Sequence, residues 1–76
     1  MNLTEFKDGD KVKVLNIPIG RDALSRLTSM NIRIGTKLEV ITQQPFYGPV
    51  TVKVGNSEQT IGRGLAQKIE CEEYNG

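Results

Sequence analysis

Histidine is absent from this chain of 76 residues, and cysteine occurs once, at Cys71. Without histidine, the chain cannot build a Ser-His-Asp arrangement or use an imidazole as a general base. With a single cysteine, it can form neither an internal disulfide nor a soft-ligand zinc or iron site within one chain. These absences predict a protein that is not an enzyme and that carries no cofactor and no metal of its own.

Long apolar runs are missing as well. No stretch approaches the roughly 18 consecutive apolar residues that a membrane-spanning helix needs. The first residues carry acids at Glu5 and Asp8 where a signal peptide would have its apolar core. A lone cysteine is typical of a reducing compartment, and Cys71 shares its phase with Ile69, which predicts a buried thiol. The sequence therefore predicts a cytoplasmic chain that does not span a membrane.

The charges that are present nearly cancel, with a net charge of +1, but they are unevenly placed. Residues 20–53 carry five basic and two acidic side chains, whereas residues 54–76 carry two basic and four acidic ones. Two interpretations stay open: ordinary solvated surface, or a basic face that meets an acidic partner. Glu70, Glu72 and Glu73 could likewise hold a hard cation loosely or simply form a solvated acidic end.

Alternating apolar residues predict five short strands, and one segment predicts a helix. The strands are expected at residues 11–17, 36–43, 50–54, 58–61 and 68–72, and the helix at residues 20–29. Residues 62–66 are expected to form a loop or a single 3₁₀ turn, and residues 73–76 a frayed tail. This order predicts one domain: a mainly β, five-stranded SH3-like barrel with a short α-helix between the first and second strands.

Three local features refine this expectation. Leu15 falls out of phase with Val14, which predicts a β-bulge in the first strand. Leu24 and Leu27 share one face of the helix at a spacing of three residues, and Met30 follows one turn later. Asn31 stands where a helix ends in the left-handed conformation, which asparagine tolerates better than most residues.

A set of residues spread along the chain forms a pattern that resembles the FeoA family, whose members are small SH3-like domains. The pattern begins with Leu3, Gly9, Asp10, Val12 and Val14, continues with Arg26-Leu27, Ile32 and Gly35, and ends with Pro45, Gly48-Pro49, Ala66 and Ile69. The residues that define the fold in this resemblance are Gly9, Leu27, Asn31, Gly35, Pro45, Gly48, Pro49, Ala66 and Ile69. Three departures are visible: Met30-Asn31 replaces a usual Leu-Gly, Cys71 replaces a valine-like residue, and Phe46-Tyr47 replaces a Gly-rich loop tip.

The resemblance implies an accessory role in bacterial ferrous iron uptake, exerted by contact with a large GTP-dependent permease, FeoB. The contact would involve the permease's cytosolic GTPase domain or its inner face, and weak homo-oligomers would be compatible with it. The partner-binding residues expected on this basis are Arg26, Arg33, Lys37, Phe46 and Tyr47. Two alternatives remain, since the aromatic pair could cap the barrel and Arg26 could be held by a carboxylate of the same chain.

A second interpretation comes from a different class of function. Residues 7–14 also resemble the opening of a KOW motif, the SH3-like unit of ribosomal and transcription-elongation proteins. Such nucleic-acid-binding domains usually carry a clear basic excess, because neutralising phosphates supplies much of their affinity. A net charge of +1 fits that function poorly, and no nucleic-acid partner is expected.

Overall fold

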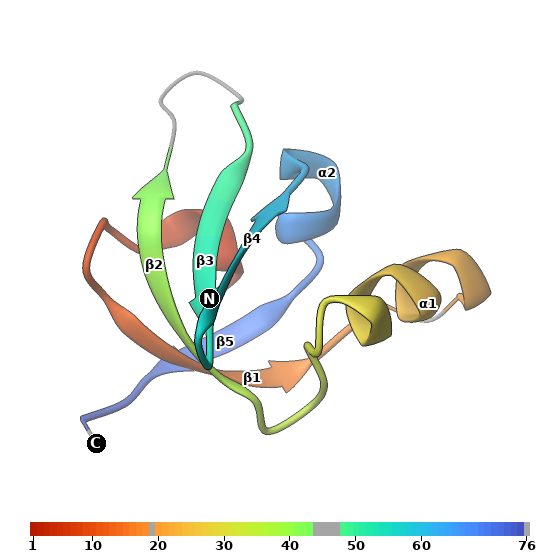
Figure 1. Ribbon diagram of the computed structural model, residues 1–76, viewed down its shortest axis with the longest axis horizontal. Helices are drawn as coiled ribbons and strands as arrows, with labels where there is room; N and C mark the ends of the chain where they lie inside the picture. Colours follow the sequence, from red (N-terminus) through yellow and green to blue (C-terminus); the bar gives the residue numbers. More distant parts are fainter. Residues whose placement is uncertain (19, 44–47, 76) are drawn as a thin grey trace.

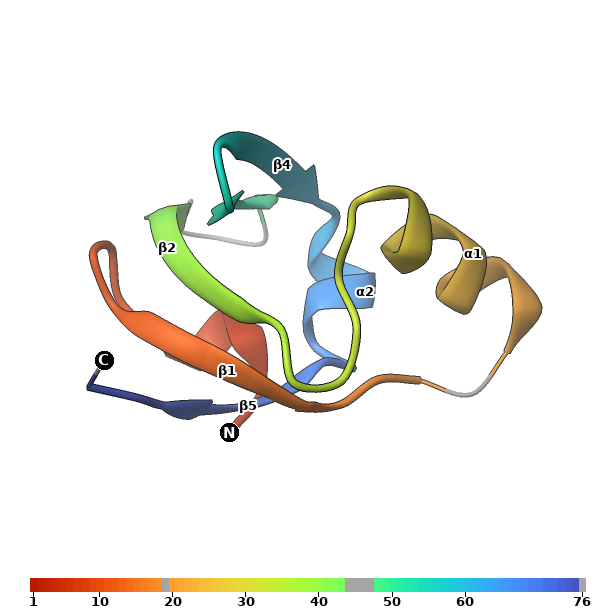
Figure 2. The same cartoon turned by 60° about the horizontal axis from the view of Figure 1, so that its bottom comes forward.

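The computed structural model describes residues 1–18, 20–43 and 48–75. In this part of the chain, five antiparallel strands form one sheet in the order β4-β3-β2-β1-β5. The strands are β1 (Lys11–Asn16), β2 (Lys37–Gln43), β3 (Val50–Val54), β4 (Ser57–Ile61) and β5 (Glu70–Glu73). The sheet curls on itself (Figures 1 and 2), and the helix α1 (Arg21–Ser29) follows β1. The predicted small SH3-like barrel is confirmed.

Strand β1 pairs with both β2 and β5, and it contains the predicted bulge. Val12 and Val14 are fully buried, as their alternation predicts. The register with β5 shifts between Val14 and Asn16, which leaves Leu15 as the extra residue, 44% exposed. A second shift occurs in β2 between Val40 and Thr42. Such bulges increase local twist and help a short sheet to close.

The N-terminal segment covers part of the outer edge of β5. A 3₁₀ helix, η1 (Leu3–Glu5), is capped by Asn2, whose own N–H donates to the Glu5 carboxylate at 2.7 Å. Backbone bonds then join this segment to the end of the chain: Leu3 N–H donates to Ile69 O at 3.0 Å, and Cys71 N–H donates to Met1 O at 2.8 Å. The two terminal segments thus close the barrel together.

Two predictions about the second half of the chain need correction. Residues 63–66 form a short α-helix, α2 (Arg63–Ala66), rather than a loop or a 3₁₀ turn. The tail is also ordered further than expected, because Glu73 belongs to β5 and Tyr74 N–H donates to Lys11 O at 3.0 Å. Tyr74 is therefore fixed beside β1.

The core is wholly apolar: among the described residues, no polar or charged residue is buried. Every strand contributes to the core, and Leu3, Phe6, Leu27, Ile32, Ala66 and Ile69 complete it from outside the strands. Burying a charge without a partner is costly. A core made of apolar side chains avoids that cost and needs no buried hydrogen-bond network. The functional groups of the described chain consequently lie on its surface.

Candidate partner-binding surfaces

Helix α1 is held to the barrel by one side chain of its own, Leu27, which is fully buried. The helix ends at Met30, whose N–H donates to Arg26 O at 3.2 Å and to Leu27 O at 3.1 Å. Asn31 then adopts φ 61°, which confirms the predicted left-handed residue and turns the chain back so that Ile32 enters the core. The beginning of the helix has no comparable anchor.

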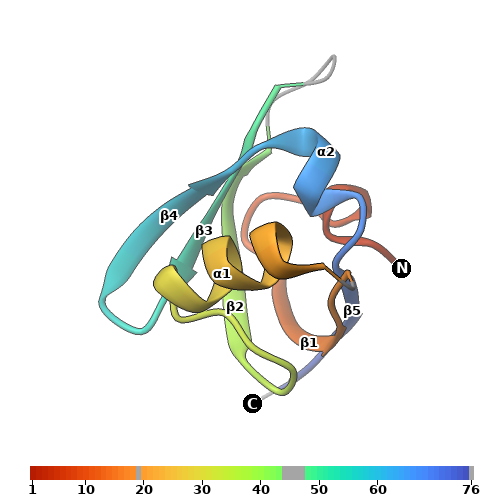
Figure 3. The ribbon, with the colours of Figure 1, turned by 90° about the vertical axis from the view of Figure 1, so that its right-hand side faces the viewer.

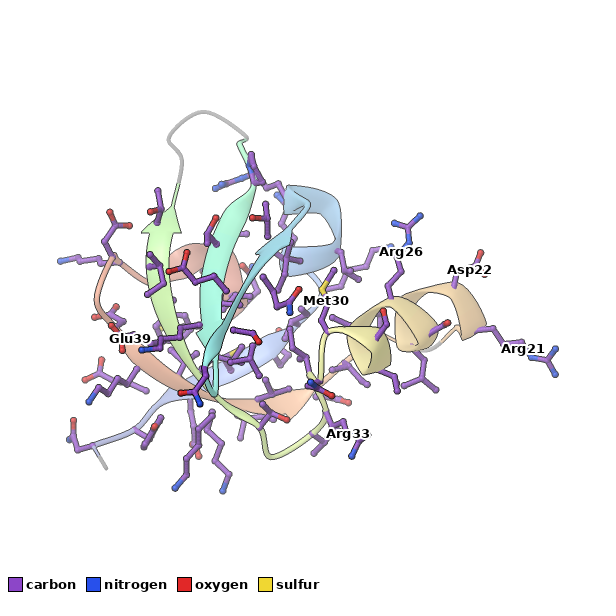
Figure 4. The ribbon with its side chains drawn as sticks, in the orientation of Figure 1. Arg21, Asp22, Arg26, Met30, Arg33 and Glu39 are labelled. Atoms are coloured by element: carbon purple, nitrogen blue, oxygen red, sulfur yellow. The ribbon has the colours of Figure 1, made fainter. Side chains whose placement is uncertain are left out.

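The first two turns of α1 extend away from the strands, with Arg21 at the far end (Figures 1 and 4). Viewed from the helix side, α1 lies between β4 on one flank and β1 with β5 on the other (Figure 3). Leu24 is 49% exposed, so the predicted apolar stripe of the helix is only partly used by the core. Leu24 lies with Arg21, Ser25 and Thr28 on the solvent-facing side of α1. We call the exposed surface of this helix the α1 face; Arg21 and Leu24 lie on one side of it, and Arg26, two residues after Leu24, lies on the other side.

The arginines of this region are not neutralised by the chain. Within residues 1–18, 20–43 and 48–75, the one ion pair joins the N-terminal ammonium to Glu70 at 3.5 Å. Arg26 thus has no intramolecular carboxylate partner there, although Asp22 precedes it by one turn. Arg33 is positioned by a turn in which its N–H donates to Thr36 Oγ1 at 2.9 Å. In Figure 4, Arg26 and Arg33 point away from each other, one to each side of α1.

The hairpin tip can be placed only in part. Pro45, Phe46 and Tyr47 lie outside the described residues, so the predicted aromatic contact stays a prediction. After the tip, Gly48 O accepts a hydrogen bond from the Arg63 guanidinium at 3.4 Å, which links the hairpin to α2. Pro49 is exposed.

Lys37 belongs to a different surface from Arg26 and Arg33. It opens β2, at the end opposite the hairpin tip, and its Nζ lies 5.1 Å from the centre of the Tyr74 ring. Lys37 and Tyr74 line a hollow of about 250 Å³ together with Lys11, Glu39 and Lys53. Of the basic residues expected on one side of the helix and its exit, Lys37 therefore lines this hollow, whereas Arg26 and Arg33 do not.

Cys71 is buried, with 1% of its surface exposed, as its strand phase predicts. Burial raises the pKa of its thiol from 9.0 to about 11, so the neutral form is stabilised. The Sγ lies 3.8 Å from the backbone oxygen of Ile69. A buried, protonated thiol is a packing group and a poor nucleophile.

The acidic residues near the chain end alternate along β5. Glu72 lies opposite Lys13, whereas Glu73 lies opposite Val12. No group of three or more cysteine or carboxylate side chains in the described chain is placed to hold a metal ion. The same part of the chain contains no helix that is long and apolar enough to cross a membrane.

We call the hollow of about 250 Å³ the lysine hollow. Four of its charged or aromatic residues were not predicted as site residues: Lys11, Glu39, Lys53 and Tyr74. The outward phase of Lys11 and Lys53 was visible, because Val12, Val52 and Val54 mark the inner face of the same strands. What could not be predicted was the register between the strands, which decides which outward-facing residues lie side by side.

The described barrel, with its apolar core, its charged surface and a helix held at one end, defines a small SH3-like binding domain. The chain belongs to the FeoA domain family, whose model matches residues 1–73. A provisionally named Fe(2+) transport protein A of Methanocaldococcus jannaschii is 49% identical over 72 residues, covering 92% of this chain and 85% of the relative.

Solved structures give the same classification. The crystal structure of an iron uptake regulatory protein, FeoA, superposes with a TM-score of 0.90 at 34% identity, covering 97% of both chains. A manganese-dependent transcriptional repressor matches with a TM-score of 0.82 at 26% identity, over 91% of this chain and 39% of its own. The same fold therefore occurs both as a small protein and as one part of a larger regulator.

Proposed function

We propose that this protein is a non-enzymatic accessory factor of ferrous iron uptake that acts by contact with a FeoB-type permease on its cytosolic side. Membership of the FeoA family and the 49% identity to a relative named for Fe(2+) transport support the transport process. The α1 face supports the mode of action, because it combines a half-exposed leucine with arginines that no described carboxylate neutralises.

The single observation that carries the proposal is the incomplete docking of α1. A nine-residue helix is too short to be stable alone, yet Leu27 is its one fully buried side chain, and Met30 at the cap is only partly buried against the core. Leu24 and the flanking arginines therefore remain available for a partner. Protein interfaces commonly combine an apolar anchor with arginine, which suits contact with a mixed apolar and acidic surface.

The proposal can be tested with ¹⁵N-labelled protein and the full permease of the same genome in lipid nanodiscs, with empty nanodiscs as the control. We expect selective loss of amide signals for residues of α1 and its exit, since bound molecules tumble slowly. The variant Leu24→Ser with Arg26→Glu should abolish the loss, while the control Lys68→Glu, an exposed charge change after α2, should not.

The same variants give a cellular readout. In a strain lacking the gene, ferrous iron uptake should be restored by the unaltered protein and by Lys68→Glu, but not by the α1 double variant. Equal signal loss with empty nanodiscs, or full rescue by the double variant, would refute the proposed contact.

A further inference from the structure

We propose that the hollow between β1, β2 and β3 is a second binding site, which takes an acidic segment of a protein partner through Lys11, Lys37 and Lys53. This inference goes beyond the proposed function, because it concerns a surface separate from the α1 face and assumes nothing about the permease. Figure 4 shows the separation: Glu39, inside the hollow, lies on the opposite side of the barrel from α1.

The site is built by the register of the sheet. Lys11 pairs with Glu39 across β1 and β2, and Glu39 pairs with Lys53 across β2 and β3. Because Val12, Leu38 and Val52 are buried, the alternating residues of the same strands face outward. One row across the outer face therefore carries a lysine on each side of a carboxylate, with the two lysine backbones about 10 Å apart.

Tyr74 and Lys37 form one wall of this hollow. Tyr74 is fixed by its backbone bond to Lys11 O, and its ring lies under the Lys37 ammonium at 5.1 Å. A cation over an aromatic face is attracted by the ring quadrupole. This contact orients Lys37 but does not neutralise its positive charge, because the tyrosine ring carries no net negative charge.

The lysines of the hollow are left with unpaired charge. None of Lys11, Lys37 and Lys53 has a carboxylate of the described chain within ion-pair distance, although Glu39 is the strand neighbour of Lys11 and Lys53 and Glu58 lies opposite Lys53 on β4. Lys37 also lies directly opposite Lys13, and like charges in this position are destabilising. Lys13 has Glu72 as its neighbour on β5, so the lysine side chains that an anionic ligand would pair with are Lys11, Lys37 and Lys53, which form no ion pair within the described chain.

The half-buried carboxylate of Glu39 favours a peptide over a nucleic acid as the ligand. A polyphosphate laid across the row would place a fixed negative charge against Glu39. An acidic peptide instead brings carboxylates for the lysines and backbone N–H groups that can donate to Glu39. The volume of about 250 Å³ holds side chains of such a segment rather than a folded domain, and the net charge of +1 provides little general attraction for nucleic acid.

The test is an amide NMR titration of the full chain with a hexaglutamate peptide, and in parallel with a single-stranded thymidine hexanucleotide. We expect the peptide to shift the amides of Lys11, Lys37, Lys53 and Tyr74, and the shifts to fade as salt is raised and charges are screened. The double variant Lys11→Gln, Lys53→Gln should weaken peptide binding about five- to tenfold, as expected for losing two exposed ion pairs. Its matched control, Lys7→Gln with Lys68→Gln, removes two exposed charges outside the hollow and should leave binding unchanged.

Three results would overturn the inference: no peptide shifts, peptide shifts spread equally over the α1 arginines and Lys68, or tighter binding of the oligonucleotide than of the peptide. The experiment is also separable from the permease test. Loss of permease contact on changing Leu24 and Arg26 leaves the lysine hollow intact, and absence of peptide binding leaves the α1 face intact.

Discussion

Replacing Leu27 by alanine should uncouple α1 from the barrel, because Leu27 is the buried side chain of that helix. Leu→Ala substitutions in cores cost about 2–5 kcal/mol, from lost transfer free energy and from the cavity that remains. A domain of this length has a total stability of about 4–11 kcal/mol by the usual per-residue range. A cost of about 3 kcal/mol would thus remove a large part of it.

The control is one turn away on the same helix. Leu24 is 49% exposed, so truncating it to alanine loses about half of the burial of a leucine, and the better helix propensity of alanine offsets part of that loss. We expect Leu24→Ala to cost less than about 1 kcal/mol. The two variants delete the same atoms and differ only in where those atoms lie.

Urea unfolding followed by far-UV circular dichroism measures both costs, and thermal unfolding gives a second estimate. With about 4–8 °C per kcal/mol for a domain of this size, Leu27→Ala should lower the Tm by about 12–24 °C and Leu24→Ala by less than about 8 °C. Equal losses for the two variants would refute the anchoring of α1 through Leu27. A stable Leu24→Ala that still loses permease contact would separate binding from folding.

Three further predictions concern single positions. Because burial raises the Cys71 pKa from 9.0 to about 11, only the unfolded chain loses this proton near pH 9. Stability from Cys71 is fully present below pH 9 and should fall by about 2 kcal/mol by pH 11. Urea unfolding from pH 7 to 11 should show a steeper decline than in Cys71→Val, and parallel curves would contradict the assignment. Asn31 has a φ of 61°, a conformation that valine tolerates poorly and glycine adopts freely. Asn31→Val should therefore lower the free energy of unfolding by about 1–2 kcal/mol, whereas Asn31→Gly should be nearly neutral. Equal effects of the two variants in urea unfolding would argue against the left-handed conformation. Tyr74→Ala should lower stability by only about 1 kcal/mol through loss of the Lys37 contact while weakening hexaglutamate binding in the titration, and unchanged binding would remove Tyr74 from the site.

The barrel was predictable because its strands carry a strong alternating pattern. Val50, Val52 and Val54 mark β3 directly, and the phase change at Leu15 located the bulge before any partner strand was known. Asn31 marked the end of α1 by its tolerance of positive φ. These signals are local, so they survive without knowledge of the rest of the fold.

The errors arose where tertiary contacts decide the outcome. Helix α2 has only four residues, one of them Gly64, and its N-cap is Gly62, so its own helix propensity is poor. It is stabilised by Ala66, which packs into the core. Tyr74 follows the last predicted strand, so it was expected to belong to a frayed tail. A backbone hydrogen bond from Tyr74 N–H to Lys11 O fixes it instead. The lysine hollow depends on register, and a shift by one residue would turn every lysine of a strand to the other face.

The two surfaces make a joint expectation about affinity. If one partner engages both the α1 face and the lysine hollow, the second contact forms within an existing complex, so its contribution is governed by effective concentration rather than by free ligand. In that case the α1 variant and the lysine variant should each weaken binding of that partner severely. The combined variant should then bind little more weakly than either variant alone. If two partners use the surfaces separately, the double variant Lys11→Gln, Lys53→Gln should leave permease binding unchanged while weakening hexaglutamate binding about five- to tenfold. Measuring the permease affinity of the α1 variant, the lysine variant and their combination distinguishes these cases, because distant independent sites contribute additively and sites shared by one ligand do not.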